Sequence, residues 1–268
     1  MGLYLSPFPE DVDILFSEMS IAIVSDIHLC RTDEPAYAQL LSWMEEVDAE
    51  HIVFLGDVFH FWWGNSRSIH PLGRPLFEAI AANSRRVTWV RGNHDFHVGK
   101  AEVSLSGMEV VDSLELAFGD VRVFLTHGDQ ADRTIGYRLL ATALRSRIFE
   151  WFMGALGING SRVVGEALAG HSRDHQYGEE IIEAQLKWAS EIITTGDFDV
   201  VIAGHTHKGG LTPVRGGLFA NSGSFGVGGS WLRLSGDGLS VMSLSGEGHT
   251  VEQEWVFKGQ TSPASDAG

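Results

Sequence analysis

The chain has 268 residues, of which 44% are hydrophobic, and its formal net charge is −16. This length and composition fit one large α/β domain, or such a domain with an inserted cap. The acidic balance argues against a nucleic-acid partner, because such proteins need a basic surface for phosphates. A single cysteine excludes an intrachain disulfide. With no signal peptide and no apolar run of about 20 residues, we expect a cytoplasmic protein.

Apolar runs alternate with helical patterns along most of the chain. Pro35 suits the first turn of a helix over 35–47, and a second helix is predicted over 74–84. The apolar runs predict buried strands at 21–25, 52–55, 87–90, 121–126 and 199–203. Alternation of this kind favours parallel strands covered by helices.

The segment between the last two of these strands differs in charge. Residues 133–173 contain six arginines against Glu150 and Glu166 and so carry +4. Within it, residues 138–158 place apolar side chains on one helical face, which is typical of a helix packed on a core. The arginines and the aromatic cluster around Trp151 also fit an inserted cap, about 133–195, that shelters acyl chains and touches an anionic membrane. A helix over 179–193 would return the chain to the core.

The last third is rich in glycine and short apolar runs. It predicts an antiparallel portion with strands at 212–219, 230–235, 239–244 and 250–257. The main domain is expected to span 20–258. The tail over 259–268 is predicted to be disordered.

Polar motifs follow each of the five buried strands. They read SDIH at 25–28, GD at 56–57, GNHD at 92–95, HGD at 127–129 and GHTH at 204–207. The carboxyl ends of parallel strands converge on one crevice, so these loops can meet in space. They would bring together Asp26, His28, Asp57, Asn93, His127, His205 and His207.

These side chains are the ligands of a metal centre. Seven oxygen and nitrogen ligands are too many for one tetrahedral ion and suit two adjacent ions. Asp57 can bridge both ions through its two oxygens, and Gly56 permits close approach. A ligand set without thiolate favours manganese, with iron(II) or zinc as alternatives. Each motif alone is an ordinary turn or cap; their joint occurrence after buried strands favours the metal centre.

The blocks SDIH, GDVF, GNHD, THGD and GHTH, in this order over residues 25–207, resemble those of the calcineurin-like metallophosphoesterases. The resemblance implies an α/β fold, a four-layer α/β/β/α sandwich, here with an inserted helical cap, and a dinuclear centre above two sheets. It implies one metal on Asp26, His28, Asp57 and His207, and the other on Asp57, Asn93, His127 and His205.

The resemblance also makes His94 the histidine of the GNHD block that binds no metal. Two bound cations can produce hydroxide from water. His94 can protonate the leaving-group oxygen or stabilise charge there, with Asp95 orienting it. The remaining histidines are interpreted as surface or supporting residues, with His97 the strongest candidate for an exception. They are His51, His60, His70, His97, His171, His175 and His249.

The runs GDVFHFWWG at 56–64 and GNHDFHVGK at 92–100 resemble the UDP-2,3-diacylglucosamine diphosphatases of lipid A biosynthesis. Those enzymes cleave a pyrophosphate to give UMP and 2,3-diacylglucosamine 1-phosphate. The best-known branch of that family has arginine where this chain has His94, so this protein belongs to a histidine-bearing branch or its substrate differs. The expected partner is a phosphorylated lipid or nucleotide-sugar substrate, with peripheral contact to the inner membrane and no nucleic acid.

Two other classes of function compete. One is a soluble metallophosphoesterase acting on a phosphoprotein, a cyclic nucleotide or a dinucleoside polyphosphate. The other is a binding module without catalysis, against which the complete ligand set argues. Trp62 and Trp63 line an apolar entrance or pack in the core. Substrate contacts are expected from Asn93, His94, Asp132, Arg133, Ser172 and His205.

Overall fold

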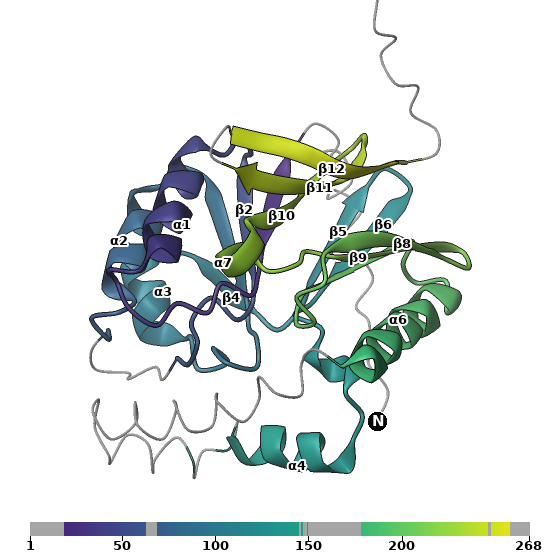
Figure 1. The fold of residues 1–268 in the computed structure, drawn as a ribbon, viewed down its shortest axis with the longest axis horizontal. Coiled ribbons are helices and arrows are strands. Elements are labelled where there is room, and N and C mark those ends of the chain that lie inside the picture. Colours follow the sequence, from purple (N-terminus) through teal and green to yellow (C-terminus); the bar gives the residue numbers. More distant parts are fainter. Residues whose placement is uncertain are drawn as a thin grey trace, which may run out of the picture.

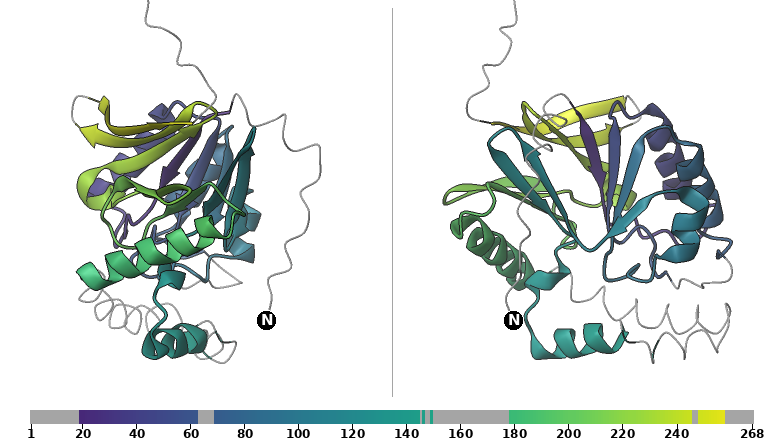
Figure 2. Two further views of the ribbon diagram at one scale, coloured as in Figure 1. Left: turned by 90° about the vertical axis from the view of Figure 1, so that its right-hand side faces the viewer. Right: turned by 180° about the vertical axis from the view of Figure 1, so that it is seen from behind.

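In a computed structural model of the protein, the described residues are 19–62, 69–144, 146, 149, 178–245 and 248–257. Two β-sheets face each other, and helices cover the outer face of each sheet (Figures 1 and 2). This arrangement confirms the predicted α/β/β/α sandwich.

The first sheet has seven strands in the order β12-β11-β10-β1-β2-β3-β4. Its parallel half consists of β1 (Ile21–Val24), β2 (His51–Leu55), β3 (Arg86–Val90) and β4 (Glu109–Val111). Its antiparallel half consists of β10 (Ser230–Ser235), β11 (Gly238–Ser245) and β12 (Gly248–Val256). The outer face is covered by α1 (Pro35–Glu46), α2 (Arg74–Ala82) and α3 (Lys100–Ser106).

The second sheet has five strands in the order β5-β6-β7-β9-β8. It contains β5 (Leu114–Phe118), β6 (Val121–Leu125), β7 (Val200–Ala203), β8 (Gly210–Val214) and β9 (Gly217–Asn221). The single strand predicted over 212–219 is wrong: a turn at Arg215 and Gly216 divides it into β8 and β9, which pair antiparallel. The outer face is covered by α6 (Glu179–Thr194).

Three layers of apolar side chains separate these four layers. Along β1, Ile21 and Ile23 face the second sheet, whereas Ala22 and Val24 face the helices. The third layer lies between the second sheet and Trp188, Ala189 and Ile193 of α6. Because both faces of the central strands are buried, their sequences are continuously apolar, which made them detectable.

Two further parts bear on the sequence predictions. Trp62 is 1% exposed and stacks on Phe59 with ring centroids 4.4 Å apart, so it packs in the core. Trp63 lies outside the described residues. A short α7 (Phe225–Gly228) joins β9 to β10. The structure also contains α3, β4 and β5, which the sequence analysis missed because they are short and weakly patterned.

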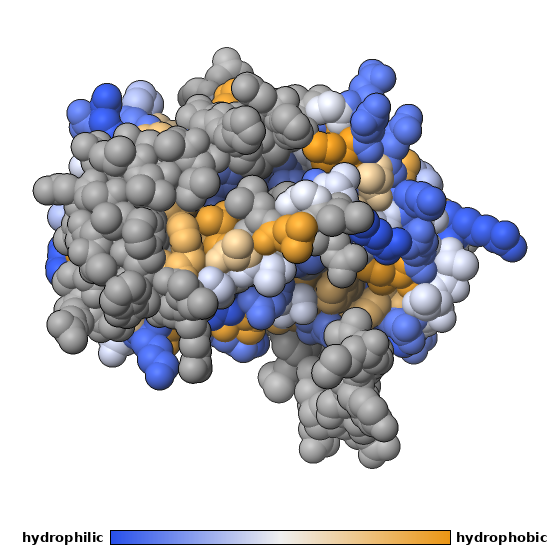
Figure 3. Space-filling view, turned by 90° about the horizontal axis from the view of Figure 1, so that it is seen from below, coloured by the Kyte–Doolittle hydropathy of each residue, from blue (hydrophilic) through white to orange (hydrophobic). Residues whose placement is uncertain are grey.

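After β6 the chain forms η1 (Asp129–Ala131) and α4 (Ile135–Leu144). Helix α4 lies apart from both sheets, at the bottom of Figure 1, and Leu139 on it is 66% exposed. Seen from that side, the described part of the surface shows orange apolar patches among blue polar residues (Figure 3). Most of 138–158, the tail 259–268 and Ser172 lie outside the described residues, so the cap insertion stays a prediction. Among the described residues, none of the helices combines the length and apolar character needed to cross a bilayer.

Candidate metal centre

The loops that follow β1, β2, β3, β6 and β7 converge where the two sheets meet. The first sheet delivers Asp26, His28, Asp57 and Asn93, and the second delivers His127, His205 and His207. The convergence follows from topology: within each sheet these strands run parallel, so their carboxyl ends share one edge.

One group of ligands joins the β1 loop to the β7 loop. Asp26 Oδ1 lies 3.2 Å from His207 Nε2, and His28 Nε2 lies 3.0 Å from the same nitrogen. Asp26 Oδ1 and His28 Nε2 are 3.9 Å apart. Three such atoms can surround one cation, and together they form a candidate metal-binding group.

The second group joins the β2 and β3 loops to the second sheet. Asp57 Oδ2 lies 3.3 Å from His127 Nε2, and Asn93 Oδ1 lies 3.0 Å from that nitrogen. His205 completes the group, because one of its nitrogens lies within 4.8 Å of both Asp57 and His127 ligand atoms. This set again offers only oxygen and nitrogen.

The two carboxylates provide a test of whether metal ions fit. Asp26 Oδ2 accepts the His205 N–H at 2.9 Å and the Ser25 hydroxyl, and Asp57 Oδ1 accepts the His94 N–H at 2.9 Å. The other oxygens, Asp26 Oδ1 and Asp57 Oδ2, are buried and accept no hydrogen bond from the described residues. A buried carboxylate oxygen without a partner is costly. Divalent cations at these positions would satisfy both oxygens.

Backbone strain marks the same residues. Among the described residues, every non-glycine residue with positive φ is a predicted ligand. Their φ values run from +53° to +71°, and they are Asp26, His28, Asp57, His205 and His207. This conformation costs roughly 1–2 kcal/mol per residue. Strain of this kind persists where surrounding structure imposes it, commonly at functional sites.

Two glycines are required by close approach. Gly56 has φ +84°, and a Cβ there would lie 2.6 Å from His127 Nδ1, which confirms the sequence argument for this position. At Gly204 a Cβ would lie 2.4 Å from Ser25 Oγ and 2.5 Å from Asp26 Oδ2. A side chain at either position would therefore push apart loops that hold ligands.

The electrostatics favour charged carboxylates. Burial acts to raise the pKa of Asp57, but His127 and His94 outweigh it and hold that pKa well below the usual range. Burial acts to raise the pKa of Asp26 as well, but the neighbouring imidazoles of His207 and His127 outweigh it and lower that pKa. Both side chains are therefore anionic at neutral pH, as cation binding requires.

The histidines divide into two kinds. Burial lowers the pKa of His28 to about 3 and that of His205 to about 4, so both are neutral and able to ligate. Burial also opposes the charged form of His127, yet Asp57 outweighs it and raises the His127 pKa well above its usual value. A metal ion at Asp57 would therefore displace a proton from His127.

His94 lies beside the ligands and is 3% exposed. Its Nε2 is 3.9 Å from Asp57 Oδ2, and its Nδ1 is 2.6 Å from the His60 carbonyl oxygen. Because a carbonyl only accepts, Nδ1 carries the proton in this contact and Nε2 is left to face the centre.

Asp95 does not contact the His94 ring in the way the sequence indicated. Its two oxygens accept the N–H groups of Gly92 at 2.7 Å and Val58 at 2.9 Å, which ties the β3 loop to the β2 loop. Burial, with the charge of Asp57 added, raises the Asp95 pKa to about 7. The His60 carbonyl, rather than Asp95, thus orients the ring of His94.

A buried amide network supports the GHTH loop, and sequence reasoning missed it. Gln185 of α6 donates from Nε2 to the Gly204 carbonyl at 2.9 Å and accepts from the Thr206 hydroxyl at 3.2 Å. Asn221 donates to the same carbonyl at 2.8 Å. The available signal was a glutamine on the apolar face of a predicted helix, where Trp188 and Ala189 are also buried.

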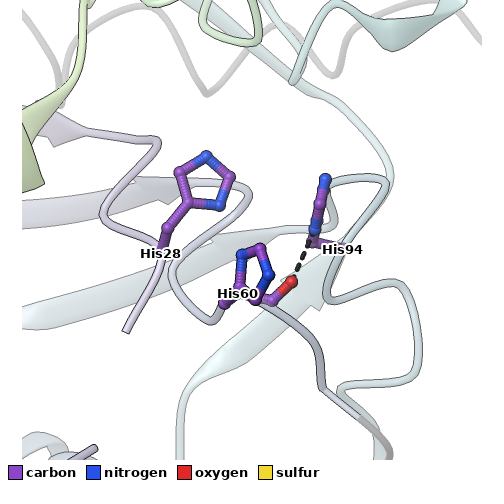
Figure 4. A group of neighbouring side chains, drawn as sticks. All are labelled: His28, His60 and His94. Carbon is purple, nitrogen blue, oxygen red and sulfur yellow. Dashed lines mark hydrogen bonds between the residues drawn. The ribbon is translucent and has the colours of Figure 1, made fainter. Parts of the chain in front are cut away.

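His60 is a further residue that sequence reasoning passed over. One nitrogen of His60 lies within 4.8 Å of a nitrogen of His28 and of His94, as the three rings in Figure 4 show. His97, the histidine singled out from sequence, instead packs against Phe96 with ring centroids 4.3 Å apart. His60 therefore replaces His97 as the additional histidine near the centre.

The predicted substrate contacts beyond the centre are partly described. Asp132 and Arg133 follow η1 and line a cavity of about 620 Å³ with Lys187 and Trp188 of α6. Arg133 is exposed and pairs with Glu191 at 2.8 Å. Ser172 lies outside the described residues, so these contacts stay predictions.

The sequence was compared with known families and proteins. Residues 19–209 match the model of the calcineurin-like phosphoesterase family. A UDP-2,3-diacylglucosamine hydrolase of Aeromonas salmonicida is 27% identical over 71% of this chain and 78% of its own length. A protein of the same name from Blochmanniella pennsylvanica is 29% identical over 71% of this chain and 80% of its own length. Another from Shewanella baltica is 25% identical over 87% of this chain and 100% of its own length.

Two solved structures align with most of the chain. A phosphoesterase from E. coli, Yfce, aligns with a TM-score of 0.48 and 20% identity over 89% of this chain and 99% of that chain. Vacuolar protein sorting 29 from Cryptosporidium parvum aligns with a TM-score of 0.47 and 15% identity over 90% and 100%. The family match covers most of the chain and contains all five ligand loops. The protein is thus a member of the calcineurin-like phosphoesterase family of hydrolases.

Proposed function

We propose that this protein is a dinuclear metal-dependent diphosphate hydrolase that cleaves UDP-2,3-diacylglucosamine to UMP and 2,3-diacylglucosamine 1-phosphate. The reaction class rests on one observation: two adjacent ligand groups contain buried carboxylate oxygens with no hydrogen-bond donor among the described residues. The substrate rests on relatives named UDP-2,3-diacylglucosamine hydrolase.

The ligands divide between two ions. Asp26, His28 and His207 hold one, and Asn93, His127 and His205 hold the other. Asp57 belongs to the second group, and its two oxygens would allow it to be shared by both ions. Manganese is the first choice, with iron(II) and zinc as alternatives, because the donors are carboxylate, imidazole and amide without thiolate.

The chain's own residues do the remaining chemistry. When bound, two divalent ions supply hydroxide at neutral pH and neutralise the phosphoryl oxygens. In its doubly protonated form His94 presents Nε2–H to the leaving-group oxygen and gives up that proton, while its Nδ1–H stays on the His60 carbonyl. The strained ligand loops keep Asp26 and Asp57 in place while substrate binds.

The lipid part of the substrate is assigned to the segment after His127. The arginine-rich part of the predicted insertion, residues 133–173, shelters the acyl chains and rests on an anionic inner-membrane surface, whereas α6 packs on the second sheet. Leu139, 66% exposed on α4, supports this assignment. Asp132, Arg133 and Ser172 contact the nucleotide or sugar.

The test is hydrolysis by purified protein loaded with Mn²⁺. UMP release from UDP-2,3-diacylglucosamine is measured beside hydrolysis of bis(p-nitrophenyl) phosphate, and Asp57→Ala serves as the inactive control. The proposal expects preference for the nucleotide lipid and loss of both activities after chelation. Hydrolysis of the small diester without UMP release would instead favour a soluble metallophosphoesterase acting on a phosphoprotein, cyclic nucleotide or dinucleoside polyphosphate.

A further inference from the structure

His60 lies beside the proposed proton donor, and the reaction described above gives its side chain no role. Its ring centroid lies 5.6 Å from that of His94 and 6.0 Å from that of His28. The side chain is almost buried, at 7% exposure. The three rings come from the loops after β1, β2 and β3 and lie around one space (Figure 4).

The contacts of the neighbouring rings leave donors directed at this space. His28 Nε2 lies 3.0 Å from His207 Nε2 on the metal side; when Nε2 binds a metal ion, the ring proton of His28 must lie on Nδ1. That nitrogen is buried and has no hydrogen-bond partner among the described residues. A buried N–H without an acceptor is costly, so the site calls for one.

An anionic oxygen fits the space. Hydrogen bonds to oxygen are about 2.7–3.2 Å long, so nitrogens around one oxygen can be as much as about 5 Å apart. The separations within 4.8 Å among the three rings meet this condition. A metal ion in this space would need ring nitrogens about 2.0–2.1 Å from it. It would bind His94, which could then not protonate the leaving group.

We infer that His60, with His28, binds an oxygen of the phosphoryl group that departs in the reaction, and so favours diphosphates over simple phosphodiesters. The inference rests on the proposed function and names the residues that recognise the second phosphate. The hydroxide oxygen forms a bond to one phosphorus while the bond to the bridging oxygen breaks. The electron pair stays on that oxygen, which takes the His94 proton, and His60 only binds.

The test compares two non-hydrolysed ligands on the Mn²⁺-loaded protein. Methylenediphosphonate has two phosphoryl groups, and inorganic phosphate has one. Calorimetry should show His60→Ala binding methylenediphosphonate about 10–100-fold more weakly, the value of one hydrogen bond to a charged group, with phosphate affinity unchanged. His60→Gln, which keeps a donor, should recover part of the loss. His70→Ala removes an imidazole near Trp62 and should bind as the wild type does.

Several outcomes would overturn the inference. Equal weakening for both ligands would make His60 a general support. Loss of bound manganese in His60→Ala would make it a support for His28, and loss of a third equivalent of metal would make the trio a cation site. If the wild type binds methylenediphosphonate no better than phosphate and releases no UMP, the proposed function itself fails. If the wild type prefers methylenediphosphonate and releases UMP, and His60→Ala binds both ligands as the wild type does, only this inference fails.

Discussion

The two sheets contribute chemically different halves of the centre. The loops of the first sheet bring both carboxylates, Asp26 and Asp57, whereas the loops of the second sheet bring only imidazoles, His127, His205 and His207. Negative charge therefore comes from the first sheet alone, and most of the imidazole nitrogens come from the second. Neither half can hold two divalent ions alone, so the centre exists only when the sheets pack together.

The two halves are also held by different means. Asp26 and Asp57 are anchored by backbone N–H groups of His205 and His94, which belong to other ligand loops. The GHTH loop is anchored from behind by the amides of Gln185 and Asn221. The carboxylates are thus positioned by the centre itself, whereas two of the imidazoles depend on α6 and β9.

The largest expected effect comes from breaking the carboxylate half. Asp57→Ala should lose bound metal and lower turnover by more than about 10⁴-fold, because a bound ion lowers the pKa of its water from 15.7 to about 7. Metal content and hydrolysis rates are measured together. Asp112→Ala is the matched control, since that exposed carboxylate pairs only with Arg91 at 2.9 Å among the ion pairs of the described residues. Full activity after chelation would contradict the metal assignment.

A smaller effect is expected at His94, which we propose to be catalytic without binding an ion. His94→Ala should retain both metals and slow turnover by roughly 10²–10⁴-fold, the range for a positioned acid. Turnover and metal content are compared with those of His249→Ala, which changes an exposed histidine on β12. A metal loss as large as that of Asp57→Ala would place His94 among the ligands.

The imidazole half can be weakened without touching a ligand. Gln185→Leu should lower metal affinity by about 10–100-fold, the usual cost of removing a residue that supports metal ligands. Titration of Mn²⁺ into chelator-stripped protein measures this. Gln253→Leu is the control, because its amide accepts the Leu211 N–H at 2.8 Å on the exposed strand β12. Unchanged metal affinity in Gln185→Leu would show that the GHTH loop keeps its conformation without the Gln185 amide.

The last effect is on folding stability and lies at the start of β2, at the other end of the strand from Asp57. His51 is buried against the Thr88 hydroxyl at 2.9 Å, and burial lowers its pKa from 6.5 to about 4. As pH falls below 6.5 the unfolded chain takes up this proton before the folded one does. The contribution of buried, neutral His51 to the free energy of unfolding is complete above pH 6.5. It is lost progressively down to about pH 4, at about 1.4 kcal/mol per pH unit.

Urea unfolding of the metal-free protein between these pH values measures the loss. His51→Gln keeps a polar contact to Thr88 without an ionisable ring, so its free energy of unfolding should fall less steeply with acid than that of the wild type. Parallel curves for the two proteins would show that His51 does not titrate in this window.

Part of the architecture was predictable because it leaves local patterns. Strands buried on both faces read as apolar runs, as in β1, β2 and β7. A helix start such as Pro35 needs only its neighbours in sequence. The ligand loops were predictable for the same reason, since each directly follows a strand whose end the pattern marks.

The remaining features depend on contacts between residues far apart in the chain. The roles of Asp95 and His60 follow from how the β2 and β3 loops touch, and no spacing in either loop records that contact. Gln185 reaches Gly204 only because α6 packs behind β7. By itself the sequence determined the buried strands β1, β2, β3, β6 and β7 and which ligand types follow them, because these are properties of short segments. The tertiary structure alone decided which side chains face one another, because packing of two sheets and their helices brings distant loops together.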